Sequence, residues 1–385
     1  MKARQPQTLV GALVFSPRSG VFVTTTAPRV VSTRPRPVSP EPQGDYREIA
    51  LTVRGAGLLE RRHAHYWVRL IALPVIAAIG IAIFIIIGDT WWQLITAAVA
   101  GMLFTQAAFL GHDAAHRQIF TSARWNLWTS YIVADLFVGL SIGWWQTKHT
   151  AHHLYPNQVG QDPDIEMPVI AVTPAKVAET RSRPLRWLMQ HQGALFFPLL
   201  MFEGISLHLS ALHRVFSREP VPHRAVEITF LMIRLGGFVA LVFWVLSPGV
   251  AVAFLAVQLA VFGVAMGASF APNHKGMPVV PAGIRLDFLT RQVMMSRNVR
   301  GGRAIDILLG GLNYQVEHHL FPTMPRPNLR RAAPMIESYC RDRGIPYTST
   351  GLFESYGIVI RYINRVGLSE RDPFECPMLQ QRASI

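Results

Sequence analysis

Cysteine is nearly absent from this sequence, and charge of either sign is scarce. Only Cys340 and Cys376 occur in 385 residues, both in the C-terminal part, which excludes a disulfide framework and a thiolate-bound metal cluster. Charged residues make up 16% of the chain and hydrophobic residues 50%, a balance typical of a membrane protein.

Lysine is rare as well, because the 37 basic residues include four lysines and therefore 37 − 4 = 33 arginines. We interpret this bias as the codon usage of a GC-rich genome and expect a bacterial cell membrane as the setting. A formal net charge of +14 would be compatible with a nucleic-acid-binding protein, but the arginines lie in segments that flank apolar runs. That distribution is typical of cytoplasmic membrane flanks, so we expect membrane lipid and no nucleic acid as a partner.

The chain divides into three regions by composition. Residues 1–44 are rich in Pro, Arg, Ser and Thr and predict a disordered basic tail, because they hold too few apolar residues for a core. Residues 45–365 predict a membrane domain, which opens with an interfacial amphipathic helix over 45–67. Residues 366–385 predict a polar C-terminal tail.

Four apolar runs approach the roughly 20 residues that span a bilayer, and they predict two transmembrane hairpins. The runs are residues 70–88 with 90–110 and residues 228–247 with 250–271. Gly88-Asp89 and Ser247-Pro248-Gly249 supply the two turns. Arg234 lies inside the third run, where we expect it either to snorkel or to face the protein interior.

Two more apolar segments, residues 125–145 and 194–216, carry acidic residues or histidines. If either crossed the membrane once, the bilayer would separate histidine clusters on its two sides, so we predict interfacial helices. Lys and Arg number ten between residues 111 and 225 and none in the two turns, which places the termini and clusters in the cytoplasm. The predicted fold is an all-α integral membrane protein with four transmembrane helices in two hairpins, interfacial helices and a cytoplasmic histidine-rich cap.

Three clusters near these runs carry side chains of the kind that bind metals. They are His112 with His116, then His149 with His152 and His153, then Gln315 with His318 and His319. Spacings of three or four residues place such side chains on one face of a helix. His274 lies just beyond the last span on the same predicted side and is a further candidate ligand.

Eight histidines and the Gln315 carbonyl exceed the six ligands that one metal takes, so the set predicts two metals. Imidazole suits zinc, copper, iron or nickel, and the ligands alone do not choose among them. A position beside an apolar interior favours oxygen activation near an aliphatic chain, while metal-assisted hydrolysis stays open. Acidic neighbours either orient the ligands or are solvated carboxylates; they are Asp113, Asp162, Asp164, Glu166 and Glu317.

The phrases around these clusters resemble the histidine boxes of the membrane-bound fatty acid desaturases. They are Gly111–His116, Trp144–His153 with Asn157 and Asp162–Ile165, and Gly311–Pro322, within a likeness that runs from about residue 45 to 365. Gln315 resembles the start of the third box in the front-end and linoleoyl-type subgroup. The resemblance implies two irons on the eight histidines and Gln315, with O2 as co-substrate and a fatty acyl substrate.

Many front-end members carry a fused cytochrome b5 domain with a His-Pro-Gly-Gly motif, which this sequence does not hold. We therefore expect a separate electron donor, of ferredoxin or cytochrome b5 type with its reductase. The expected function is an O2-dependent desaturase that introduces a double bond into an acyl-CoA or acyl-lipid.

Two other functions compete with desaturation. A membrane diiron hydroxylase or ketolase of a lipid would use the same ligands. A transporter with ion-binding histidines would need polar residues inside the spans, and residues 70–88 and 250–271 have almost none. Arg326, Arg330 and Arg331 either bind a phosphate-bearing head group or serve as a basic membrane flank.

Overall fold

The computed structural model describes residues 14–15, 22–23 and 44–368. Contacts divide the chain into two units, Met1–Pro42 and Gln43–Ile385. In the first unit, β1 (Val14–Phe15) pairs antiparallel with β2 (Phe22–Val23), a pairing that the sequence did not predict. The rest of the predicted N-terminal tail lies outside the described residues, and so does the C-terminal tail beyond residue 368.

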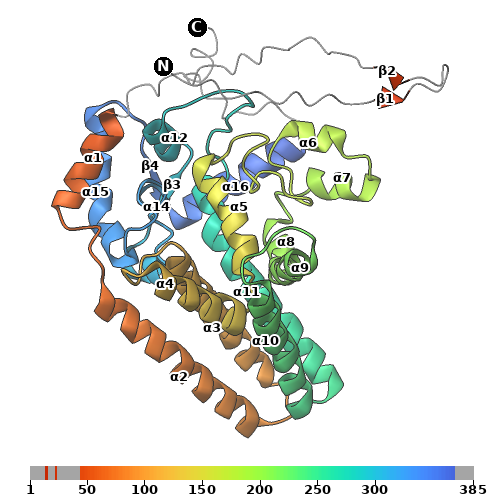
Figure 1. The fold of residues 1–385 in the computed structure, drawn as a ribbon. Coiled ribbons are helices and arrows are strands. Elements are labelled where there is room, and N and C mark those ends of the chain that lie inside the picture. Colours follow the sequence, from red (N-terminus) through yellow and green to blue (C-terminus); the bar gives the residue numbers. More distant parts are fainter. Residues whose placement is uncertain (1–13, 16–21, 24–43, 369–385) are drawn as a thin grey trace. The chain divides into compact units, whose positions relative to one another are not determined.

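Four long apolar helices form the two predicted hairpins of the second unit (Figure 1). They are α2 (His63–Ile87) with α3 (Gln93–Ala115) and α10 (Arg224–Val245) with α11 (Pro248–His274). Each helix continues beyond its apolar run at one end, through histidines or arginines that lie outside the run. A helix does not have to end where its hydrocarbon-spanning part ends, so the predicted boundaries were too short there.

The two hairpin turns lie at the same end of the helices. The Asp89 carboxylate in the first turn accepts hydrogen bonds from the backbone N–H and the hydroxyl of Ser247 in the second, at 3.0 Å each. The buried Gln93 amide closes the first turn by donating to the carbonyls of Phe84 and Gly88 at 2.7 and 2.9 Å. Both hairpins therefore point the same way, and their open ends share the opposite side.

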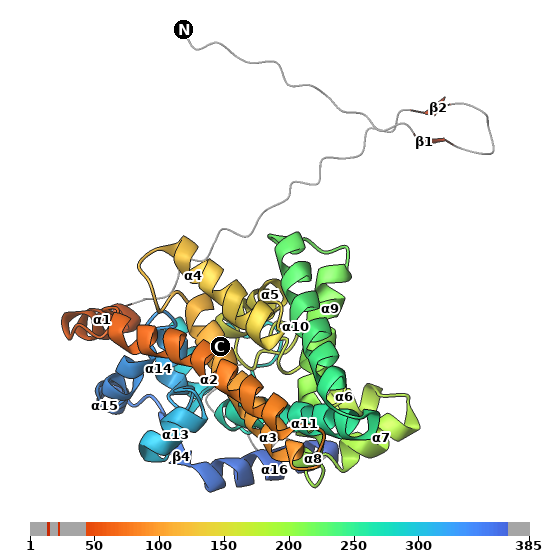
Figure 2. The ribbon, with the colours of Figure 1, turned by 90° about the horizontal axis from the view of Figure 1, so that it is seen from below.

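Helix α11 lies at the centre of this unit and contacts its neighbours through glycines (Figure 2). A Cβ added to Gly204 of α9 (Glu203–Phe216) would lie 2.4 Å from the Leu259 carbonyl oxygen of α11. A Cβ on Gly263 would lie 2.4 Å from the carbonyl oxygen of Leu200, at the end of α8 (Phe196–Leu200). The backbones approach this closely only because the side chains are absent.

The two segments predicted as interfacial helices are also helical. Residues 196–216 form α8 and α9, which together are long and apolar enough to be a fifth span. Residues 123–154 form α4 (Ala123–Ser130), the π-helical η1 (Tyr131–Val138) and α5 (Ile142–Leu154), with a bend of 112° before α5. By length and composition, the described residues thus hold five spanning helices, or six with the bent pair, and the number four stays a prediction.

Arg234 of α10 faces the protein interior, one of the two alternatives predicted for it. Its Nε donates to the Phe137 carbonyl at 2.7 Å, and its guanidinium carbon lies 4.1 and 4.3 Å from the ring centroids of Phe104 and Phe238. The Phe137 carbonyl thus accepts one N–H of the buried guanidinium, and the two aromatic faces stabilise its positive charge.

The remaining helices and strands form a cap at the open end of the hairpins. They are α1 (Gly44–Gly55), α6 (Pro174–Glu179), α7 (Arg183–Gln190), α12 (Phe288–Met294), β3 (Arg297–Arg300), α13 (Gly302–Leu308), α14 (Gln315–Leu320), α15 (Arg326–Asp342), β4 (Thr348–Gly351) and α16 (Leu352–Gly367). Strands β3 and β4 pair in parallel, which an all-α prediction missed.

The amphipathic helix predicted over residues 45–67 was wrong in its extent. Helix α1 ends at Gly55, and seven residues of turn and loop separate it from α2. Its apolar face is buried in the cap, where Ile49 and Val53 pack with Leu320 and Ile336. The apolar face of α1 is therefore covered mainly by α12 and α15.

Candidate metal centre

Four helices bring all eight predicted histidines together at the open end of the hairpins. His112 lies in the last turn of α3, and His116 caps that helix. His274 is the last residue of α11. The other two clusters lie on α5 and on α14, which is helical as predicted; they are His149, His152 and His153, and Gln315, His318 and His319.

Four of the histidines form a first group. His112, His116, His149 and His318 each offer one ring nitrogen, and these atoms lie within 4.8 Å of one another. The Nε2 atoms of His116 and His149 are 3.0 Å apart. Trp145 stacks on His149, with ring centroids 4.2 Å apart, and holds that imidazole toward the group.

Three other histidines form a second group. One ring nitrogen each from His152, His274 and His319 lies within the same 4.8 Å limit. His153 lies between the groups, because its Nε2 is 3.0 Å from His149 Nε2 and its ring stacks on His319 at 4.3 Å. The two groups are therefore adjacent.

The third cluster does not converge as a single unit. His318 faces the first group, while His319 and Gln315 face the second. Consecutive residues of an α-helix point about 100° apart, which follows from 3.6 residues per turn, so two adjacent histidines serve two positions. The expectation of one converging face was wrong for His318, although the resulting pair of groups agrees with two metals.

The buried ring nitrogens fit metal ions. Neither nitrogen of His112 or His318 has a hydrogen-bond partner, and His319 Nε2 also lacks one. Burial, reinforced by the neighbouring histidines, holds the pKa of His318 and His319 well below the ordinary value, so these rings are neutral and present lone pairs. A buried polar atom without a partner is costly unless a ligand satisfies it.

Each ring of the second group is oriented through its Nδ1. The Asp162 carboxylate holds His152 Nδ1 at 3.0 Å, and the Met295 carbonyl holds that of His274 at 3.0 Å. The Gln292 amide oxygen lies 2.9 Å from His319 Nδ1. With Nδ1 as the donor, all three rings turn Nε2 toward the common centre, the arrangement typical of histidine ligands.

Gln315 lies beside the second group, at 2.9 Å from His274 Nε2. Its amide nitrogen faces the histidine, and its oxygen accepts from the Asn273 amide at 3.2 Å. The two ends of an amide are distinguished only by their hydrogen-bonding partners, so exchange of the two would aim the oxygen at the centre.

The N-terminus of α5, which carries the second cluster, is fixed by three acceptors. Asp135 accepts from the Ile142 N–H at 3.0 Å, and the Ser141 hydroxyl accepts from the Trp144 N–H at 3.0 Å. Glu227 of α10 accepts from the Gly143 N–H at 3.0 Å and from the Ser141 hydroxyl at 2.5 Å. These bonds satisfy N–H groups that a helix start leaves unpaired and set the direction of α5.

The predicted acidic neighbours differ in their roles. Asp162 orients a ring, whereas Asp113 pairs with Arg326 at 2.7 Å. Glu317 turns away from the histidines and accepts from the Asn298 amide and the Tyr347 hydroxyl at 2.7 and 2.8 Å. Burial raises the pKa of Glu317 to about 7. Asp164 pairs with Lys148 at 2.7 Å, and Glu166 is exposed.

The three arginines after the last cluster do not act together. Arg326 lies against the buried Asp113 and the Phe109 carbonyl, with its Nη2 at 2.7 Å from each, and a head-group role for it stays a prediction. Arg330 pairs with Asp306 at 3.3 Å, and Arg331 is exposed.

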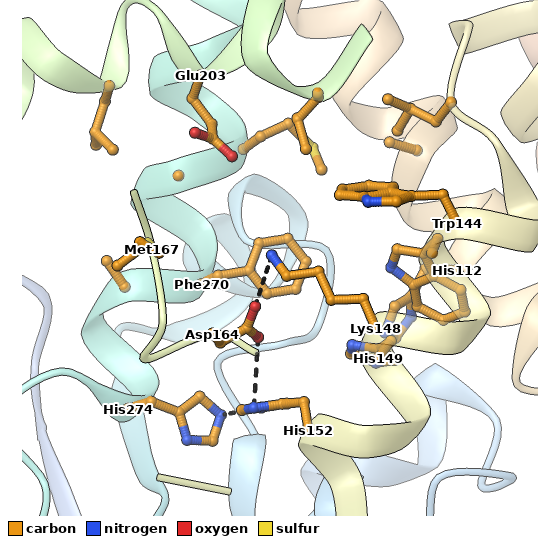
Figure 3. Close-up of a pocket in the computed structure, with 18 of the residues that line it drawn as sticks. His112, Trp144, Lys148, His149, His152, Asp164, Met167, Glu203, Phe270 and His274 are labelled. Carbon is orange, nitrogen blue, oxygen red and sulfur yellow. Dashed lines mark hydrogen bonds and ion pairs between the residues drawn. The ribbon is translucent and has the colours of Figure 1, made fainter. Parts of the chain in front are cut away.

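A cavity of about 200 Å³ reaches both groups of histidines (Figure 3). His112 and His149 of the first group and His152 and His274 of the second lie along its wall. Most of its lining is apolar; these residues include Ala108, Phe109, Leu140, Ile142, Leu207, Met266 and Phe270. The space therefore suits an aliphatic chain held against both groups.

Sequence reasoning missed three contributors to this site. Gln292 and the Met295 carbonyl lie just before β3, in a segment without a recognisable pattern, and they contact the site only through tertiary packing. Trp145 gave a usable signal, because it stands four residues before His149 and therefore on the same helical face.

Comparison with known proteins agrees with this geometry. The sequence model of the family described as fatty acid desaturase matches residues 89–351. The chain is 28% identical over 343 residues to a Delta(8)-fatty-acid desaturase of Borago officinalis, covering 85% of this chain and 76% of that protein. An Acyl-lipid (9-3)-desaturase of Physcomitrium patens is 29% identical over 340 residues, covering 85% and 63%.

A fungal relative is also similar, the Delta 8-(E)-sphingolipid desaturase of Kluyveromyces lactis. It is 28% identical over 352 residues, covering 86% of this chain and 60% of that protein. The family match extends over more than half of the chain and includes all three histidine clusters. The chain therefore belongs to the fatty acid desaturase family.

Proposed function

We propose that this desaturase holds two iron ions on its eight histidines and introduces a double bond, with O2, into an acyl chain lying in the cavity of about 200 Å³. The observation that carries the proposal is that histidines of both groups line one apolar cavity. An aliphatic chain in that cavity would lie against histidines of both groups.

The ligands divide between two positions. His112, His116, His149 and His318 would hold one ion, and His152, His274 and His319 the other, with His153 between them and Gln315 beside the second. When bound, two irons supply the redox chemistry by which O2 removes hydrogen from two neighbouring methylenes. Imidazole ligands without thiolate are suited to such iron chemistry.

The chain's own residues position the substrate and keep water out. Apolar side chains such as Phe109, Met266 and Phe270 line the cavity and exclude water from the reacting carbons. Trp145 and Asp162 fix His149 and His152, two of the histidines on the cavity wall. Correct placement of the chain against both groups is the protein's main contribution to rate and regioselectivity.

Electrons come from a separate donor of ferredoxin or cytochrome b5 type in this proposal. Reduction of O2 to water takes four electrons and desaturation yields two, so two more are required. Among the described residues the one cysteine, Cys340, is free and buried, so they provide no four-thiolate cluster.

The proposed membrane arrangement has the cap and the chain termini in the cytoplasm. Asp89 and Ser247 join the hairpin turns at the far end, and the arginine-rich segments lie at the end of the cap. We propose a bacterial cell membrane, supported by the arginine bias alone. The names of the relatives support a substrate that is a fatty acyl, acyl-lipid or sphingolipid chain.

Expression in a host that lacks the product, together with a reductase and donor, tests the function. Gas chromatography of the lipids should show a new unsaturated acid. A hydroxy acid would instead identify a hydroxylase, and unchanged lipids with active donor would contradict both.

A further inference from the structure

A second cavity shares the lining residue Trp144 with the first. The first cavity, which carries the histidines, has Trp144 in its wall, and a second cavity of about 430 Å³ has the same residue in its own wall. Nothing in the proposed chemistry uses the second space. Trp144 is therefore a residue that an apolar cavity and an unassigned one have in common.

Most of the residues that line the second cavity are polar, although more of its exposed lining is apolar than polar. Trp144 and Leu209 are its apolar lining residues; the others are Ser210, His213, Arg214, Ser217 and Glu219. Five polar residues around one space contrast with the mostly apolar residues that line the first cavity. Such a pair of cavities suits an amphipathic ligand with its chain in one and its polar end in the other.

Arg214 has hydrogen-bonding capacity to spare. Its Nη2 donates to the Thr147 hydroxyl and the Pro220 carbonyl, both at a long 3.3 Å, and its Nε is buried without a partner. Its Nη1 pairs with Glu219, whose side chain is 65% exposed. Because the Glu219 carboxylate is mostly solvated, a phosphate that engages the guanidinium fork can compete with it.

The second cavity lies at the depth expected for lipid head groups. It is formed by the end of α9 and the loop before α10, and α10 starts at the end of its hairpin where α11 delivers His274. Leu209 and Phe216 beside it are 59% and 62% exposed, while Arg218 in the next loop is also exposed. Apolar and basic exposed residues meet here, as they do at a membrane interface.

We propose that this second cavity binds the phosphate of the substrate's head group through Arg214, with the acyl chain passing Trp144 to reach the histidines. This inference rests on the proposed function. Trp144 and His149 stand five residues apart on α5, about 7.5 Å at a rise of 1.5 Å per residue, a short span for an acyl chain. Phospholipids and coenzyme A thioesters share the required phosphate.

The test compares variants of the full chain in membranes, supplied with reductase and donor. Substrates carry one acyl chain on coenzyme A, on a phospholipid or on a neutral galactolipid. Arg214→Gln should raise KM at least tenfold for a phosphate-bearing substrate, leave kcat unchanged and leave the galactolipid unaffected. Glu219→Gln should lower the same KM, because it removes the competing carboxylate. Arg218→Gln, which changes an exposed arginine nearby, should leave both KM and kcat unchanged for every substrate.

The outcomes separate the alternatives. If Arg214→Gln raises KM for the coenzyme A thioester only, or for the phospholipid only, that substrate is identified as the natural carrier of the chain. If Arg214→Gln matches Arg218→Gln on every substrate, or if the wild type accepts the galactolipid alone, the inference is overturned. If Arg214→Gln does not accumulate in the membrane, Glu219→Gln provides the test: a lower KM for phosphate-bearing substrates supports the inference, and an unchanged or higher KM overturns it. If the wild type desaturates nothing, the proposed function fails, and equilibrium binding of the thioester to wild type and Arg214→Gln still tests the cavity.

Discussion

Asp162→Asn is the substitution that tests the second metal position with the least change of shape. Both carboxylate oxygens lie 3.0 Å from His152 Nδ1. One of them also accepts from the Asp164 N–H at 2.9 Å, and the other from the Asn157 N–H at 2.7 Å. An asparagine replaces one carboxylate oxygen by an NH2 group. In either orientation of the amide, that NH2 group faces a backbone N–H and cannot accept from it.

The substitution therefore leaves one buried N–H unpaired and His152 less firmly oriented. An unsatisfied buried donor costs about 1–3 kcal/mol of stability. Loss of the partner that orients a histidine ligand lowers metal affinity or activity about 10- to 100-fold. We expect Asp162→Asn to show both effects, measured as thermal unfolding and as iron bound over a titration.

The matched control is Asp287→Asn. Asp287 caps α12 by accepting from the Thr290 N–H at 2.9 Å, and Asn is as good a cap as Asp. Its variant should keep wild-type iron affinity. If Asp162→Asn binds iron as tightly as Asp287→Asn does, the proposed role of Asp162 in orienting His152 is refuted.

Three further predictions follow from packing and charge. Gly204→Ala should cost about 1–3 kcal/mol in thermal unfolding because its Cβ would meet the carbonyl of Leu259, while Gly236→Ala, in open space, should cost nothing measurable. Arg326→Gln should lose about 3–5 kcal/mol by stranding the buried Asp113, and an effect equal to that of the exposed Arg330→Gln would contradict the buried pair. Chelation of the bound metal should lower the free energy of unfolding by about 2.7 kcal/mol for each site occupied at a free metal concentration of 100 Kd, and Tm should fall reversibly with it; an unchanged Tm would show that the metal does not support the fold.

The hydrophobic part of the fold was predictable because composition alone defines it. Apolar runs predicted α2, α3, α10 and α11, and the error lay at the open ends, where the helices continue through polar or charged residues. The parallel pairing of β3 with β4 could not be predicted, since each strand has four residues and pairs across a long stretch of chain. The burial of α1 in the cap depends on tertiary contacts that an amphipathic pattern does not specify.

The sequence predicted which histidines form the site, but not how they divide into two groups. Spacing identified seven of the eight histidines, because metal ligands on a helix recur every three or four residues, and His274 was identified by its place just beyond the last span. Assignment of His318 to one group and His319 to the other needed the positions of α3 and α11 around α14. Gln292 orients His319 from a segment with no recognisable motif, so only the folded chain reveals it.

Iron content of the purified full chain tests most directly whether the eight histidines form two metal positions. Elemental analysis after expression with iron should give about two ions per chain for the wild type. His319→Ala should retain about one, since it removes a ligand of the second group only, and His191→Ala, on an exposed histidine outside both groups, should retain two. A single ion in the wild type, or unchanged iron in His319→Ala, would contradict the two-iron site.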